Sequence, residues 1–583
     1  MRRTRLIASL ALACLLAACQ SPNEPPPAPG AAPNAPAAAA APSPEWDSFR
    51  DAFIEGFFEL NPSFAVEQGR HEFDGQIGNW SDEGFARRIE FLRIAIDGAA
   101  AFDAAQLTQP QAFERDYLAH VARRELFWLE DADQPHKNLT WYFDNGLDPS
   151  VYITRPYADP PTRLRAFIAY LRAVPPAVEQ IRANLEVPMP LSFVEYGIAG
   201  FNGFADFYRG DAIAAFARVD DAALQQELTT AVETAARAMA DMAAWLESQR
   251  ATATQDFALG AERFARMLQE TEGVTVPLDE LETIGRADLA RNRQALEESC
   301  AVFAPEATLG DCMLQMDARK SPEGPVAEAR NQLPALKQFI ADTDLVSIPG
   351  TEEALVEEAP PYNRQNSAYI NIPGPYDMGM PSVYYISPPD PSWTPEQQAA
   401  YIPGIKNLLF TSVHEVWPGH FLNFLHATRS PSLFGRIFVG YAFAEGWAHY
   451  AEELVIEAGL DGGSPETRIG QLSNALLRDC RYLSAIGLHA RGMTQEESRE
   501  LFRTECFQDE GTARQQSARG TYDPAYLNYT LGKLMIRKLR EDYTASRGGR
   551  AAWKEFHDRF LSYGGPPIPL VRRAMLGNDS PAL

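Results

Sequence analysis

The chain has 583 residues and a formal net charge of −26 at pH 7, with 45% hydrophobic and 22% charged residues. This composition is that of a globular protein rather than a disordered one, and the length exceeds that of most single domains. The strong negative charge argues against nucleic acid as a partner and against electrostatic binding to an anionic lipid surface.

The first residues have the pattern of an exported protein. Arg2, Arg3 and Arg5 precede an apolar run over residues 6–16. A basic start, a short apolar run and small residues before a cleavage point predict a signal peptide over residues 1–18. No later stretch of eighteen apolar residues exists, so we expect the rest of the chain to be soluble.

A lipid anchor is predicted at the end of this signal. Leu16-Ala17-Ala18-Cys19 resembles the lipobox of bacterial lipoproteins, which implies cleavage before Cys19 and lipid attachment to it. An ordinary secretory signal cleaved after Ala18 is the alternative. Gln20 favours the outer membrane, with the protein facing the periplasm. The Pro- and Ala-rich residues 19–44 predict a semi-extended tether.

Beyond the tether, most of the chain has the apolar periodicity and residue types of helices. Thr494 and Glu497 have the spacing of a capping box. The helical pattern is interrupted near Pro349-Gly350, which predicts a domain boundary there. The clearest predicted helices are 46–60, 220–252, 278–303 and 464–491.

A short β-structure is predicted within residues 367–386. Tyr369-Ile370-Asn371-Ile372 and Val383-Tyr384-Tyr385-Ile386 are rich in β-branched and aromatic residues between Pro-rich connections. An exposed strand edge here could hold an extended peptide by strand addition.

Four cysteines remain after Cys14 and Cys19 are set aside. Three pairings of four cysteines are possible. The pairs that are near in sequence and flank an expected helix turn are favoured, with all four reduced as the alternative. The favoured disulfides are Cys300–Cys312 and Cys480–Cys506.

Residues 414–420, His-Glu-Val-Trp-Pro-Gly-His, have the composition of a metal-binding segment. In an unbroken helix at about 100° per residue, His420 would lie about 240° around from His414. Pro418 cannot donate to the carbonyl of His414 and its ring collides with it, and Gly419 tolerates unusual backbone angles. We therefore predict a break at Pro418-Gly419 that turns His420 back toward His414. Two histidines beside an ordinary kink are the alternative.

The segment that begins at Glu445, 25 residues after His420, is predicted to complete the site. Glu445 and Glu452 are seven residues apart and share one face of a helix. A carboxylate among aromatic residues is costly to bury without a cation. His414, His420 and Glu445 form a ligand set for Zn²⁺ with one position open, and Glu452 would orient a ligand from behind. An amphipathic helix with a solvated acidic face is the alternative.

Both segments, His414-Glu415-x-x-Pro418-Gly419-His420 and Glu445-Gly446-Trp447-Ala448-x-Tyr450-Ala451-Glu452, resemble the DUF885 family. The resemblance spans roughly residues 45–575 and implies a mainly α, zincin-like, two-lobed metallopeptidase fold with a small β-sheet beside the active-site helix. It implies an N-terminal helical lobe, 45–350, and a C-terminal catalytic lobe, 351–583, that holds the zinc site. Further matching blocks are Gln68 to Asp74, Gly487-Leu488-His489-Ala490 and Tyr529-Thr530-Leu531-Gly532-Lys533.

The resemblance also implies a reaction. Zinc would lower the pKa of its water toward ~7 and polarise the scissile carbonyl, with Glu415 as general base. His489 and Tyr529 are candidate hydrogen-bond donors to the oxyanion. Three functions remain: a zinc peptidase acting on peptides in the periplasm, a cell-wall peptide amidase with the same zinc site, or a non-catalytic lipoprotein binding module. The peptidase is favoured, and the intact Glu415 argues against the binding module, whose site would have lost turnover.

Overall fold

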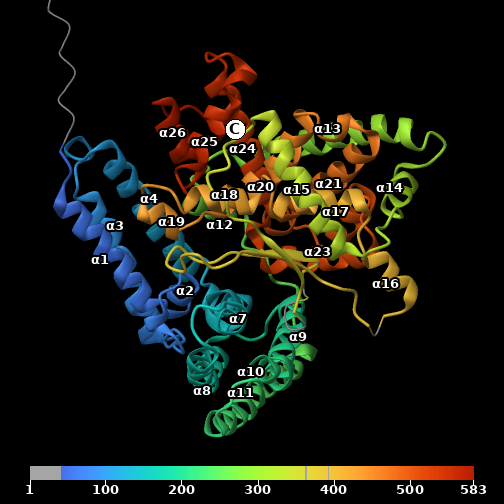
Figure 1. The fold of residues 1–583 in the computed structure, drawn as a ribbon. Coiled ribbons are helices and arrows are strands. Elements are labelled where there is room, and N and C mark those ends of the chain that lie inside the picture. The colour runs from blue at the N-terminus through green and yellow to red at the C-terminus, as the bar shows by residue number, and fades with distance from the viewer. Residues whose placement is uncertain (1–40, 361–363, 365, 392) are drawn as a thin grey trace, which may run out of the picture. The chain divides into compact units, whose positions relative to one another are not determined.

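The computed structural model describes residues 41–360, 364, 366–391 and 393–583. The predicted signal peptide 1–18, the predicted anchor Cys19 and the tether up to residue 40 lie outside the described residues. The described chain is mainly helical with one small sheet, as predicted (Figure 1). None of the described helices is long and apolar enough to cross a membrane.

Fifteen α-helices precede the sheet within the described residues, and eleven follow it. The helices before the sheet are α1 (Pro44–Leu60), α2 (Pro62–Glu67), α3 (Asp82–Ala100), α4 (Gln109–Leu126), α5 (Gln134–Lys137), α6 (Thr140–Tyr142), α7 (Ser150–Thr154), α8 (Pro160–Asn184), α9 (Leu191–Phe207), α10 (Ile213–Phe216), α11 (Ala222–Gln249), α12 (Ala261–Glu272), α13 (Leu278–Phe303), α14 (Leu309–Asp317) and α15 (Pro325–Thr343). The helices after it are α16 (Pro395–Tyr401), α17 (Ile405–Glu415), α18 (His420–Ala427), α19 (Leu433–Ile437), α20 (Tyr441–Glu457), α21 (Pro465–Ala490), α22 (Gln495–Thr504), α23 (Glu510–Tyr522), α24 (Asn528–Thr544), α25 (Trp553–Leu561) and α26 (Ile568–Leu576).

The four helices predicted most clearly are all present as α1, α11, α13 and α21, and capping side chains mark where α11 and α22 begin. The Asp221 side chain accepts from the backbone N–H groups of Ala223 and Leu224 at the start of α11. At α22 both halves of the predicted capping box form, with Thr494 and Glu497 each accepting from the other's backbone N–H. Local sequence thus determines where these helices begin.

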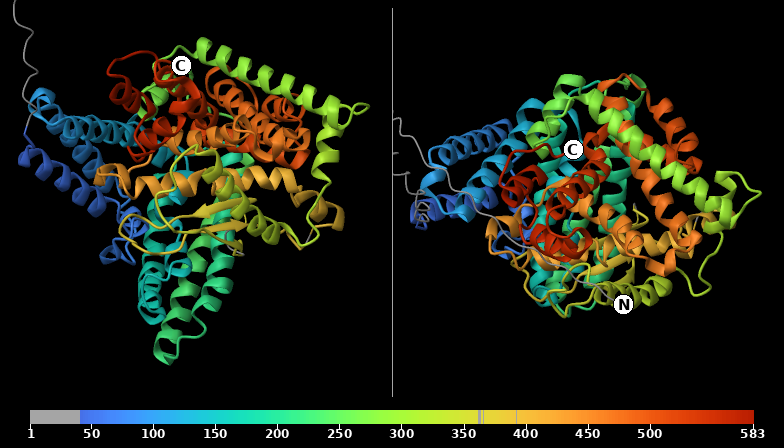
Figure 2. Two further views of the ribbon diagram at one scale, coloured as in Figure 1. Left: turned by 45° about the horizontal axis from the view of Figure 1, so that its top comes forward. Right: turned by 90° about the horizontal axis from the view of Figure 1, so that it is seen from above.

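The sheet has three strands in the order β1-β3-β2: β1 (Leu355–Glu358), β2 (Ala368–Asn371) and β3 (Val383–Ile386). β2 pairs antiparallel with β3 and aligns Tyr369 with Tyr385. β1, which the sequence analysis did not predict, pairs parallel with β3. It escaped prediction because only Val356 of its four residues is buried. β2 contacts α17, so the sheet lies beside the helix of the predicted site, as the yellow strands and light-orange helices of Figure 2 show.

Buried apolar side chains form two large clusters among the described residues. One runs from Phe127 to Met575 and includes Trp447 and Tyr450 of α20. The other is drawn from residues 46–246 together with Phe434, Ile437 and Phe438. Both clusters combine residues from either side of position 350, and the lobe boundary there stays a prediction.

Both favoured disulfides are formed in the structure. Cys300–Cys312 joins α13 to α14, and Cys480–Cys506 joins α21 to the segment after α22. Their Cα atoms are 6.0 and 6.3 Å apart, within the range that a disulfide spans. The second bond fixes a turn of α21 that lies at the site described below.

Two glycines allow α20 and α24 to cross at backbone contact. A Cβ on Gly532 would lie 2.0 Å from the carbonyl oxygen of Ala442, and one on Gly446 would lie 2.5 Å from the Cα of Gly532. These neighbours are backbone atoms and cannot rotate away. The crossing therefore fixes the position of Glu445, the residue before Gly446, relative to the start of α24.

We predict that Gly532→Ala lowers the free energy of unfolding by about 1–3 kcal/mol, because the added methyl group forces the two helices apart. Urea denaturation measures this change. Gly203→Ala is the matched control, since Gly203 is exposed within α9 and a Cβ there meets nothing within 4 Å. The control should raise stability by up to about 1 kcal/mol, as Ala has the higher helix propensity. Equal effects of both substitutions would contradict the tight crossing.

Candidate metal centre

The helix that carries His414 ends immediately after it. α17 stops at Glu415, and α18 begins at His420, so the predicted break at Pro418-Gly419 is present. A Cβ on Gly419 would lie 1.8 Å from the carbonyl oxygen of His414. Only glycine permits this approach, which folds the chain over the last turn of α17 and brings His420 back beside His414.

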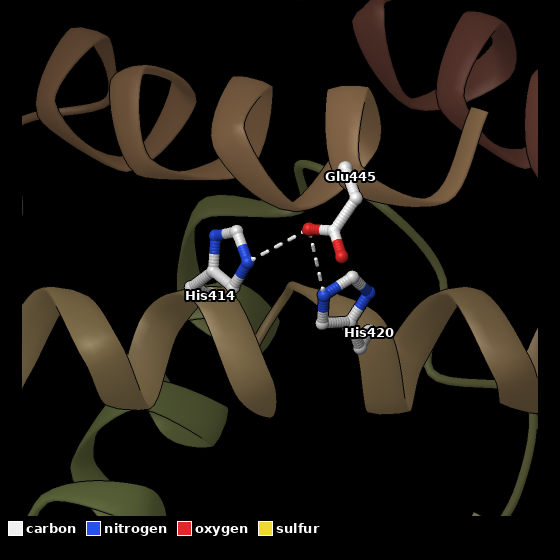
Figure 3. A group of neighbouring side chains, drawn as sticks. All are labelled: His414, His420 and Glu445. Carbon is white, nitrogen blue, oxygen red and sulfur yellow. Dashed lines mark hydrogen bonds and ion pairs between the residues drawn. The ribbon is translucent and has the colours of Figure 1, made fainter. Parts of the chain in front are cut away.

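Both histidines point at one carboxylate oxygen of Glu445 on α20 (Figure 3). His414 Nε2 is 3.2 Å and His420 Nε2 is 3.3 Å from Glu445 Oε2. The imidazole rings are nearly perpendicular, with centroids 4.8 Å apart. One donor atom from each of the three residues lies within 4.8 Å of the other two. The structure thus brings together the three residues that the sequence predicts as metal ligands.

The arrangement fits a zinc ion. Ligand atoms about 2.1 Å from a shared tetrahedral centre are roughly 3.4 Å apart, close to the two nitrogen–oxygen distances at this site. Two imidazoles and one carboxylate are a ligand set of catalytic zinc, which leaves a fourth position open. The Glu445 and His420 side chains keep 21% and 16% of their surface exposed, so the site can be reached from solvent.

Glu452 lies behind His414 and is fully buried. Its Oε1 is 2.8 Å from His414 Nδ1, and Arg478 on α21 donates to the same oxygen at 3.0 Å. A hydrogen bond from Nδ1–H to a carboxylate fixes the imidazole tautomer and leaves Nε2 free to bind a metal. The structure therefore places Glu452 where the sequence analysis expects it.

When no metal is bound, the charges of neighbouring groups determine the protonation of Glu445 and His414. Burial raises the pKa of Glu445, but the charge of His420 and hydrogen bonds with both histidines outweigh it and hold that pKa well below its usual range. Burial and the charge of Arg478 lower the pKa of His414, yet hydrogen bonds with Glu445 and Glu452 raise it to about 9. In the metal-free protein His414 is thus protonated at neutral pH.

Arg478 and His449 were missed by the sequence analysis. His449 Nδ1 is 3.4 Å from Glu452 Oε2, and burial lowers the pKa of His449 to about 3. Arg478 also donates from Nη1 to Glu452 Oε2 at 3.3 Å. No motif marks Arg478, because an arginine 64 positions after His414 looks in sequence like any other arginine on a helix.

Two other predicted residues lie beside the cluster. Glu415 is the last residue of α17 and is 9% exposed. The ring of Tyr529, at the start of α24, lies 6.2 Å from that of His414 and is 8% exposed. Both positions are compatible with the roles expected of them.

His489 is held elsewhere. Its Nδ1 accepts from the backbone N–H of Leu259 at 3.3 Å, and its Nε2 donates to the carbonyl of Gly520 at 2.7 Å. Its ring also stacks on Phe264 at 5.9 Å. With both nitrogens engaged by backbone, His489 has no donor left for an oxyanion, so the structure replaces its expected catalytic role with a packing role.

An arginine–tyrosine–aspartate group extends the site. Arg519 donates to Tyr441 Oη at 2.9 Å and to Asp523 at 3.0 Å, and the Tyr441 ring is 5.8 Å from that of Tyr529. Asp144 interacts with Asp523 and Arg519: its pKa is raised to about 7 by burial and by the charge of Asp523. Asp144 itself is exposed.

The comparisons with known proteins agree with this fold. Residues 62–575 match the family described as "Bacterial protein of unknown function (DUF885)", so the chain belongs to that family. No curated protein matches. A solved structure described as "a putative lipoprotein of unknown function" from Shewanella oneidensis is 22% identical with a TM-score of 0.75, covering 92% of this chain and 100% of its own. A second, "the putative lipoprotein from Colwellia psychrerythraea", is 18% identical with a TM-score of 0.77, covering 91% and 98%. At these identities the likeness shows a shared fold.

We predict that Glu452→Gln weakens zinc binding by about 10- to 100-fold, because a neutral amide orients His414 and raises its basicity less than a carboxylate. Competition with a chromophoric chelator measures the affinity. Glu457→Gln is the control: Glu457 is on the same helix but pairs with Arg540, away from the cluster. A zinc affinity that falls equally in both variants would argue against the support of His414 by Glu452.

Zinc affinity should rise with pH. His414 has a raised pKa of about 9 in the metal-free protein, so below that pH zinc must displace its proton. Calorimetry at pH 7.5 in buffers of different ionisation enthalpy should show release of about one proton or more on zinc binding. Affinity should increase by up to tenfold per pH unit and level off above about pH 9. Binding with no proton release would contradict this electrostatic account.

Proposed function

We propose that this protein is a zinc-dependent peptidase. The observation that supports the proposal best is the convergence of His414 and His420 on Glu445, with Glu452 supporting His414 from behind. Three ligands and an open position are the arrangement of hydrolytic zinc, whereas structural zinc sites use four protein ligands. We also propose that the mainly α chain has the two-lobed architecture of zincin-like peptidases.

Zinc bound here would supply a Lewis acid for the scissile carbonyl and a water of lowered pKa. Glu415, directly after the first ligand, takes the proton of that water and passes it to the leaving amine. The hydroxyl of Tyr529 donates to the developing oxyanion, since its ring lies against His414 and its hydroxyl has no hydrogen-bond partner within the described part of the chain. Glu452 and Arg478 keep the His414 ring oriented.

A peptide is the substrate that the surroundings favour. β2 is an edge strand, all four of its residues are partly exposed, and it contacts α17. An extended peptide that pairs with this edge would run beside the helix that carries His414 and Glu415. Attachment through Cys19 would hold the enzyme in the cell envelope, facing the periplasm at the outer membrane. A cell-wall peptide amidase would use the same zinc site.

Metal removal is the first test. Peptide hydrolysis should stop on dialysis against a zinc chelator and return when Zn²⁺ is added. Mass spectrometry of a peptide mixture and of purified peptidoglycan measures the hydrolysis of each substrate. Cleavage of peptidoglycan alone would favour the amidase. A protein that binds zinc but hydrolyses neither substrate would favour the binding module.

We predict that Glu415→Gln lowers kcat/KM by about 10²- to 10⁴-fold while zinc content is unchanged, because the amide cannot accept the proton. His426→Gln is the matched control: His426 is on α18 with His420 but donates to the carbonyl of Ser347 at 2.8 Å. This control should keep both zinc and activity. Full activity in the Glu415→Gln variant would rule out Glu415 as the base.

A further inference from the structure

Arg481 is a buried cation without an anionic partner. It lies on α21, is 9% exposed, and donates from Nε to Gln516 Oε1 at 2.8 Å. Within the described residues its other two guanidinium nitrogens have no hydrogen bond, and Arg481 forms no ion pair. The two arginines nearest to it differ, since Arg478 is paired with Glu452 and Arg519 with Asp523.

An unpaired guanidinium at this depth is costly. Burial lowers the pKa of Arg481, and so do the charges of Arg519 and Arg478. Arginine nevertheless stays protonated in proteins, so this largely buried side chain carries its charge. Its two free nitrogens are not among the fully buried atoms without a partner, so a ligand can reach them. Buried charges are normally paired or hydrogen-bonded. Arg481 has the ring of Tyr529 beside its guanidinium but no anion, and its planar fork fits a carboxylate.

Arg481 lies next to the proposed reaction centre. Its guanidinium carbon is 4.8 Å from the ring centroid of Tyr529, and that ring is 6.2 Å from the ring of His414. The guanidinium carbon of Arg481 therefore lies no farther from the centre of the His414 ring than the sum of these two distances. About three residues of extended peptide span this separation, at roughly 3.3–3.6 Å per residue.

We propose that Arg481 binds the α-carboxylate of a peptide substrate, so that the enzyme cleaves within about three residues of a free C-terminus. This inference rests on the proposed peptidase function and names its substrate class. Gln516 holds Nε and so presents the other two nitrogens to the ligand. An extended segment with its carboxylate on Arg481 places a nearby peptide bond at the metal centre.

The test compares N-acetylated peptides of one sequence that end in a free carboxylate or in an amide. A third peptide is amidated but carries Glu as its last residue, to separate an α-carboxylate from a side-chain carboxylate. We expect the zinc-loaded enzyme to cleave the free acid with a kcat/KM on the order of 100-fold above both amides, as for the loss of a charge-assisted pair. Mass spectrometry should locate the cleavage within three residues of the C-terminus.

Substitutions assign the preference to Arg481. Arg481→Gln should reduce the ratio of free acid to amide to near one, and Arg481→Lys should leave it intermediate, because a point charge lacks the planar fork. Arg514→Gln is the control: it removes the same charge from an arginine whose side chain is 71% exposed on α23, and should keep the full ratio. Zinc content and thermal unfolding check that each variant is folded.

Binding to the Glu415→Gln protein, measured by calorimetry, separates this inference from the proposed function. The free acid should bind on the order of 100-fold more tightly than the amide. The double variant that carries both Glu415→Gln and Arg481→Gln should bind the two peptides equally. Equal binding or cleavage of acid and amide would overturn the carboxylate site while leaving the peptidase proposal intact. A preference for the amidated Glu peptide would also overturn it. If no peptide is cleaved but the binding ratio holds, the carboxylate site stands and the peptidase proposal fails.

Discussion

Glu452 connects three side chains that would otherwise be unrelated. Its two buried oxygens contact His414 of α17, Arg478 of α21 and His449 of α20 itself. A carboxylate with no solvent exposure is stable only with such partners. The same contacts fix the ring of His414, hold α17 and α21 against α20, and leave Nε2 of His414 facing Glu445. The site's geometry is therefore a property of the packed core rather than of a surface loop.

Close contacts between main-chain atoms fix the remaining positions of the site residues. Gly419 lets the chain fold over the end of α17, and Gly446 with Gly532 lets α20 meet α24. The first sets the separation of the two histidines, and the second sets Glu445 and Tyr529 on facing helices. Each approach is a contact between main-chain atoms, which adjust less than side chains do. The elements that carry the site are thus held at short, fixed separations by main-chain contacts.

Much of this was predictable from the sequence. The sequence pointed to the three side chains that converge in the structure because chemistry and spacing both mark them: two histidines separated by Pro-Gly, then two glutamates seven residues apart. Long helices followed from periodicity and caps, whereas β1 did not, since its stability comes from pairing with β3, which lies 25 residues or more away. His489 shows the limit most clearly. A recognisable block located it in the chain but could not tell which way its ring faces. Arg478 and Arg481 show the converse, as burial and missing partners are visible only in space.

Cys480 of the Cys480–Cys506 bond lies between Arg478 and Arg481 in α21, two residues after the first and one before the second. The turn that carries both cations is thus covalently joined to the segment after α22. Protein produced where thiols stay reduced would lack this covalent restraint on the helix that carries Arg478 and Arg481. Preparations made in the bacterial cytoplasm and in an oxidising compartment could therefore differ in ligand recognition while sharing the same metal content.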